Sequence, residues 1–126
     1  MRMPERPTTD LSFLEGCWRT DPFRHFSGQG DSGVSTYCFD RNGRGTLVYR
    51  RGNRSCRAPA QARYDPGGAL RIVDADSRCD DGSPWGQDRL NCRQSSGGVA
   101  VCSGEGTNPG SGRLDQWSVN LHRVAR

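Results

Sequence analysis

Six cysteines carry the most definite chemistry in this sequence of 126 residues, because a thiol can form a disulfide or bind a metal ion. None of them forms a Cys-x-x-Cys pair, and both histidines lie far from any metal-ligand spacing, so the pattern favours disulfides over a zinc site. Only 32% of the residues are hydrophobic, and crosslinks can supply stability that so small a core cannot. We therefore expect an exported protein, periplasmic or secreted, with three disulfides and no metal. The six residues are Cys17, Cys38, Cys56, Cys79, Cys92 and Cys102.

A serine-containing motif close to a histidine raises the question of protease activity. Residues 30–33 have the sequence Gly-Asp-Ser-Gly, which is found around the nucleophile of chymotrypsin-like proteases, and His25 lies nearby. Such an enzyme needs an oxyanion hole, a buried aspartate and a histidine far before the serine on a separate barrel. A chain of 126 residues has no room for this arrangement. We expect a flexible loop here and no catalytic residues.

Two further patterns could bind a cation or a phosphate. Four neighbouring aspartates could attract calcium, but Arg78 stands where another oxygen ligand is needed and the calcium-loop pattern is absent, so we expect a solvated strand end. They are Asp74, Asp76, Asp80 and Asp81. Three glycines follow a strand without a helix whose N-terminus could hold a phosphate, which predicts a long loop: Gly104, Gly106 and Gly110. The sequence therefore predicts no cofactor, no metal and no enzyme activity.

All 18 basic residues are arginines, and together with 14 acidic residues they give a formal net charge of +4. The arginines are spread along the chain rather than gathered with aromatic residues, which argues against binding to nucleic acid. The densest group lies at one expected hairpin tip. It could contact an acidic partner or an anionic glycan, or only keep that end of the domain soluble. Its members are Arg50, Arg51, Arg54 and Arg57.

Short strands must position these residues. From residue 11 onward, alternating runs recur between turns rich in Gly, Asn, Asp and Pro, and no long helical period is present. The expected strands are residues 16–19, 34–39, 45–50, 56–64, 69–75, 88–93, 99–103 and 116–124. One apolar face per strand suits a closed barrel without exposed edges. We therefore predict an all-β fold, an eight-stranded antiparallel up-and-down barrel over residues 11–126, after a disordered linker at residues 1–10.

The positions of the cysteines on these strands indicate how they pair. The last two lie symmetrically about one turn and face each other across a hairpin. The middle two flank another turn, where a bulge of one residue within residues 74–78 would align them. The first two pair by elimination, with both side chains pointing outward. The expected disulfides are Cys17–Cys38, Cys56–Cys79 and Cys92–Cys102.

The two ends of the expected barrel resemble lipocalins and related short calycin barrels. Residues 13–18 have the sequence Phe-Leu-Glu-Gly-Cys-Trp, which is similar to the Gly-x-Trp opening of that family. The resemblance implies that Trp18 plugs the closed end of the barrel and that Arg123, from the last strand, stacks on its ring. Small eight-stranded barrels are filled by side chains or hold one small ligand. The side chains that would line such a ligand are Tyr37, Tyr49, Tyr64 and Trp117.

A second resemblance extends over most of the chain. The same opening is followed by Tyr-Cys-Phe-Asp at residues 37–40, Asn-Gly-Arg-Gly-Thr at residues 42–46 and Cys-Asp-Asp-Gly at residues 79–82. This series resembles a C-terminal domain of bacterial envelope proteins of the SrfA virulence-associated type. The resemblance implies an exported domain that reaches a membrane only through an anchor upstream of residue 1, and it implies no activity.

The predicted function is therefore a non-enzymatic module that binds an unknown protein or small ligand and is monomeric as an isolated domain. The alternative is a secreted inhibitor of a lysozyme or a metalloprotease, because such inhibitors also use small eight-stranded barrels with disulfides. In that case residues 1–10 or the loop at residues 21–33 would insert into the cleft of the target enzyme.

Overall fold

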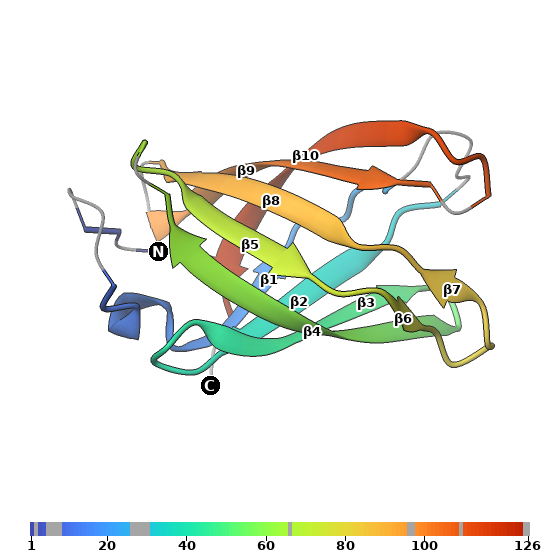
Figure 1. Cartoon of the computed structure of the whole chain (residues 1–126), viewed down its shortest axis with the longest axis horizontal. Helices are drawn as coiled ribbons and strands as arrows, with labels where there is room; N and C mark the ends of the chain where they lie inside the picture. The colour runs from blue at the N-terminus through green and yellow to red at the C-terminus, as the bar shows by residue number, and fades with distance from the viewer. Residues whose placement is uncertain are drawn as a thin grey trace.

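Eight antiparallel strands form a closed barrel in the order β1-β10-β9-β8-β5-β4-β3-β2 (Figure 1). The computed structural model describes residues 1, 3–4, 9–25, 31–65, 67–95, 98–108 and 110–124. Apart from the closure between the first and last strands, each barrel strand pairs with the barrel strands next to it in sequence, which confirms the predicted fold. The elements are η1 (Ser12–Leu14), β1 (Gly16–Thr20), β2 (Val34–Phe39), β3 (Arg44–Arg51), β4 (Arg54–Tyr64), β5 (Leu70–Asp74), β6 (Ser77–Arg78), β7 (Pro84–Trp85), β8 (Asp88–Gln94), β9 (Ala100–Thr107) and β10 (Leu114–Arg123).

A short two-stranded ribbon, β6 with β7, lies outside the barrel sheet and is not predicted by the alternating pattern. Strands of two residues contain too little alternation to be recognised in a sequence. In Figure 1 the ribbon lies at the right end of the barrel, whereas η1 lies at the left end. We call the end at the ribbon the mouth. The ribbon carries Trp85, which is buried there.

The interior of the barrel is a packed core. On β4, Ala58, Ala60 and Ala62 are buried and the residues between them are exposed, as the period of two requires. Large side chains from the other strands and from η1 fill the remaining space. Those with almost no exposed surface are Leu14, Trp18, Leu47, Tyr49, Leu70, Ile72, Leu90 and Leu121.

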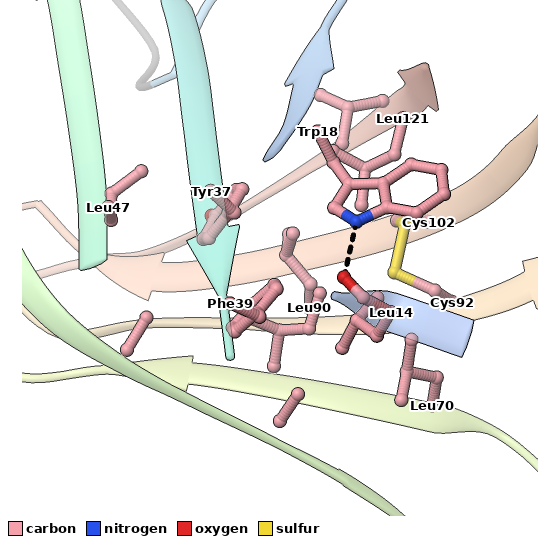
Figure 2. Close-up of a cluster of buried hydrophobic side chains, with 14 of the residues drawn as sticks. Leu14, Trp18, Tyr37, Phe39, Leu47, Leu70, Leu90, Cys92, Cys102 and Leu121 are labelled. Atoms are coloured by element: carbon pink, nitrogen blue, oxygen red, sulfur yellow. Dashed lines mark hydrogen bonds between the residues drawn. A yellow bond between two sulfur atoms is a disulfide. The ribbon is translucent and has the colours of Figure 1, made fainter. Parts of the chain in front are cut away.

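The η1 end of the barrel is closed by Trp18. Its ring is 1% exposed, and its indole N–H donates a hydrogen bond of 2.8 Å to the carbonyl oxygen of Leu14 (Figure 2). The guanidinium carbon of Arg123 lies 4.4 Å from the centroid of the indole, which is the arrangement that the lipocalin resemblance implies. Arg123 also donates a hydrogen bond of 3.2 Å to the carbonyl oxygen of Glu15, and this bond fixes the guanidinium over the ring.

Three disulfides join neighbouring strands in the predicted pairs, Cys17–Cys38, Cys56–Cys79 and Cys92–Cys102. The first and last pairs join directly opposed residues of β1 with β2 and of β8 with β9. The last pair lies in the core (Figure 2). The middle pair is one residue out of step with the register of β4 and β5, which confirms the predicted bulge. Three disulfides indicate an oxidising, extracytoplasmic environment.

Two local predictions are wrong. Gly104 and Gly106 belong to β9, where they pair with Trp117 and Asp115, rather than to a long loop. Glycine is needed at these two positions because bulky side chains pack closely against the backbone, and not because the chain turns there. Asp74 ends β5 with 3% of its surface exposed, whereas the sequence predicted a solvated strand end.

The predicted linker at residues 1–10 falls partly outside the described residues, namely at residues 2 and 5–8, and stays a prediction there. Met1, by contrast, is buried against the core, and Met3 packs against it. The described part of the chain has no helix that is both long and apolar enough to cross a membrane.

Candidate functional site

A buried histidine lies among aromatic rings at the mouth of the barrel. His25 is 3% exposed, and the centroid of its ring lies 4.9 Å from that of Trp85, 4.6 Å from that of Trp117 and 5.2 Å from that of Tyr49. Phe23 adds a fourth ring at 5.8 Å. We call these four aromatic residues the aromatic cage. They come from β3, β7, β10 and the segment after β1, so that the closed barrel is needed to bring them together.

The segment that carries His25 is fixed beside the barrel by main-chain hydrogen bonds. Phe23 and Gly33 exchange two of them, with N···O distances of 3.0 and 2.9 Å. This bridge extends the direction of β1 and β2 beyond their last paired residues. His25 therefore enters the cage from the side of these two strands.

Three glycines make room for this cluster. A Cβ atom at Gly33 would collide with the phenol of Tyr49, and one at Gly104 would collide with the indole of Trp117. A Cβ atom at Gly106 would collide with the carboxyl of Asp88. The cage is thus built from large side chains that lie directly on the backbone of neighbouring strands.

Two buried carboxyl groups complete the cluster. Asp88 is 4% exposed, and its Oδ2 lies 2.7 Å from Nε2 of His25. The main-chain N–H of Asp88 donates a hydrogen bond of 2.7 Å to Oδ1 of Asp74. The other carboxyl oxygen of Asp88, Oδ1, is buried and has no hydrogen-bond partner among the described residues. A buried acceptor without a partner is costly and calls for a physical explanation.

Burial sets the protonation of this cluster. Desolvation raises the pKa of Asp88 to about 8, and it raises the pKa of Asp74 to about 8 with a contribution from the charge of Asp88. Desolvation also lowers the pKa of His25 to about 3, and the charges of Arg54 and Arg51 act in the same direction. At neutral pH both carboxyls are therefore protonated and the imidazole is neutral. The Asp88 hydroxyl then donates the hydrogen bond to Nε2 of His25.

The four predicted ligand-lining residues do not share one cavity. Tyr49 and Trp117 meet in the aromatic cage, whereas Tyr37 is buried in the core and stacks on Phe39 at 6.1 Å. Tyr64 is half-buried near the η1 end, where its hydroxyl donates a hydrogen bond of 3.2 Å to the carbonyl oxygen of Pro4. Of the four residues, only Tyr49 and Trp117 therefore belong to one cluster.

The four arginines of the predicted partner-binding cluster lie on different sides of the β3–β4 hairpin. Arg50 lines an outer groove of about 680 Å³ over β1, β2 and β3, together with Arg19. Arg57 is exposed on β4. Arg54 turns toward the ribbon, where it donates a hydrogen bond of 3.1 Å to the Ser83 hydroxyl, and Arg51 is its register partner. They do not form one patch.

A different set of arginines surrounds a groove of about 560 Å³ on the outer face of β3, β4 and β5. Arg63 and Arg71 are directly opposed across β4 and β5, and Arg44 is opposed to Gln61 across β3 and β4. None of these three arginines forms an ion pair with a described residue. The other residues that line the groove are Gly45, Pro59, Val73, Ala75, Gln87 and, at its buried base, Ala60 and Asp74. We call this surface the arginine groove.

The pairing of His25 with Asp88 could not be found in the sequence. The two residues are 63 positions apart, too far for a local pattern to connect them. No group of three or more potential metal ligands is brought together within the described residues. Comparison with protein-family models, curated proteins and solved structures finds no match for this chain. Its function must be inferred from its own residues.

Proposed function

We propose that this domain is a non-enzymatic binding module of an exported protein and that it recognises an acidic polypeptide segment through the arginine groove. The observation that carries the proposal is the direct opposition of Arg63 and Arg71, neither of which forms an ion pair with a described residue. Like charges opposed across a strand pair destabilise the sheet. A carboxylate placed between two guanidinium groups removes that repulsion and accepts bidentate hydrogen bonds.

The chemistry of the groove favours a polypeptide over other anions. Its apolar lining can cover aliphatic side chains, and the amides of Gln61 and Gln87 can bind main-chain groups. Among the described residues, no aromatic ring on which a sugar could stack lines the groove. Because a closed barrel has no free edge, the partner cannot add a strand to the sheet and must be held by side chains.

The remaining features support a setting for the module. The Gly-x-Trp opening together with Arg123 over Trp18 supports a lipocalin-like relationship. The disulfides support a periplasmic or secreted location. The similarity to SrfA-type envelope proteins supports a place at the end of such a protein.

The inhibitor hypothesis finds less support in the structure. Of the predicted inserting loop at residues 21–33, Phe23 and His25 pack into the mouth of the barrel and are not presented to a target. Residues 26–30 lie outside the described residues. The hypothesis stays a prediction, and residual activity of a lysozyme and a metalloprotease in the presence of the domain would test it.

A binding measurement with matched charge reversals tests the arginine groove. The probe is a peptide of alternating Glu and Val, titrated calorimetrically into the oxidised domain. We expect the double variant Arg63→Glu/Arg71→Glu to lose at least about tenfold in affinity. The control variant Arg93→Glu/Arg113→Glu makes the same charge change outside the groove and should keep most of the affinity.

Two results would overturn the proposal. Equal losses in both double variants would show that only net charge matters. Tighter binding of a heparin fragment than of the peptide, lost in the groove variant, would show that the groove serves a sulfated glycan instead.

A further inference from the structure

The His25 side chain shows which kind of group the aromatic cage accepts. Its ring lies almost parallel to Trp85, with an interplanar angle of 24°, and almost perpendicular to Trp117, with an angle of 80°. Both arrangements are favourable for aromatic pairs. The cage therefore holds a flat ring between a stacking wall and an edge wall, while Asp88 binds a ring nitrogen.

The imidazole of His25 provides a hydrogen-bond partner for only one of the two carboxyl oxygens of Asp88. Oδ2 contacts Nε2 of His25, but Oδ1 is left without a partner, although the acid is almost completely buried. Oδ1 faces the backbone of β9 at Gly106, close to the ring of Trp117. A protonated carboxyl has a donor and an acceptor side by side. Its full complement is a ring nitrogen with an amino group on the adjacent carbon.

We infer that the aromatic cage and Asp88 form a binding site for an uncharged nitrogen heterocycle with an amino group beside a ring nitrogen, and that His25 occupies this site in its absence. The ring of the ligand would stack on Trp85, its nitrogen would accept the Asp88 hydroxyl proton in a hydrogen bond, and its amino group would donate to Oδ1. This site adjoins the arginine groove, because Asp74, which accepts the main-chain N–H of Asp88, also lines that groove. The inference does not depend on the function proposed for the groove.

The charges around the cage favour a neutral ligand. Arg51 and Arg54 lie close enough to act on His25, Asp115 acts in the opposite direction, and Arg89 acts on Asp88. Arg54 is itself 3.8 Å from Asp81 on the ribbon. Cations and anions would each meet like charges here, and either would lose its hydration on burial.

The test uses 2-aminopyrimidine and pyrimidine, two neutral probes that differ only in the amino group. Both are titrated into the oxidised wild-type domain at neutral pH, and the imidazole signals are followed by NMR. We expect 2-aminopyrimidine to bind about tenfold more tightly than pyrimidine. The signals of His25 should move to those of an exposed histidine, while those of exposed His122 stay constant and serve as the internal reference.

Substitutions of Asp88 and His25 distinguish specific binding at Asp88 from non-specific filling of a cavity. Asp88→Asn keeps a donor and an acceptor and should retain the preference, whereas Asp88→Leu should abolish it. The wild-type titration stands by itself if Asp88→Leu does not fold. The proposal is overturned if both probes bind equally, if His25 does not respond, or if binding occurs only in the cavity variant His25→Ala.

Discussion

The acidic residues at the barrel mouth make stability depend on pH in an unusual direction. Two buried acids, Asp74 and Asp88, have pKa values raised from 3.8 to about 8. Between these limits the folded state binds more protons than the unfolded state, so the free energy of unfolding falls as the pH rises. His25, lowered from 6.5 to about 3, acts in the opposite direction, but only below pH 6.5. From pH 6.5 to 8 the two acids are therefore opposed by one group, the Met1 amino group, whose pKa burial lowers from 8.0.

The size of the effect follows from the number of protons. One proton difference changes the free energy of unfolding by about 1.4 kcal/mol per pH unit, so two acids give a loss of the order of 3 kcal/mol across this window. Asp88→Asn removes one of the two protons. Its amide can still donate to His25, so the variant should keep its stability at pH 6.5 and lose only about half as much by pH 8.

Urea unfolding of the oxidised protein at several values of pH from 6.5 to 8 measures this directly, with Asp80→Asn as a control at an exposed aspartate. Stability that stays constant or rises with pH in the wild type would refute the reasoning, because it would show that Asp88 is ionised. A variant curve parallel to that of the wild type would equally exclude Asp88 as the source.

Three further predictions concern stability and can be checked by the same unfolding measurement. Arg123→Ala removes the cation–π contact over the indole of Trp18 and should lower the free energy of unfolding by about 1 kcal/mol. An unchanged free energy of unfolding would show that this contact does not stabilise the fold. Gly104→Ala should cost about 1 to 3 kcal/mol because its methyl group meets an indole, whereas the methyl group of Gly67→Ala would meet Asp65 Oδ1 at an ordinary contact distance of 3.4 Å and should change little; equal effects would contradict the packing described. Replacing Cys56 and Cys79 by alanine opens a loop of 23 residues and should cost about 3 kcal/mol, and an unchanged midpoint would mean that this bridge is dispensable.

Much of the fold could be predicted because strand alternation and turn residues are local signals. The run of Ala58, Ala60 and Ala62 against exposed neighbours fixes one face of β4, and that parity is enough to pair the cysteines. Even the bulge before Cys79 follows from counting residues.

The mouth of the barrel could not be predicted for physical reasons. An aspartate is usually exposed, and nothing near Asp74 in sequence shows that the ribbon and β8 will cover it. Glycines such as Gly104 and Gly106 are typical of loops, but here their lack of a side chain leaves room for the indole of Trp117 and the carboxyl of Asp88. The pair of His25 with Asp88 exists only after the barrel closes.

The central claim, that the domain binds an acidic polypeptide on its outer face, is tested most directly by mapping the acidic peptide onto the ¹⁵N-labelled domain by NMR. The account predicts chemical-shift changes concentrated on Arg44, Gln61, Arg63 and Arg71, with little change at the mouth. Changes centred on the aromatic cage, or a peptide that perturbs no part of β3, β4 and β5, would contradict it.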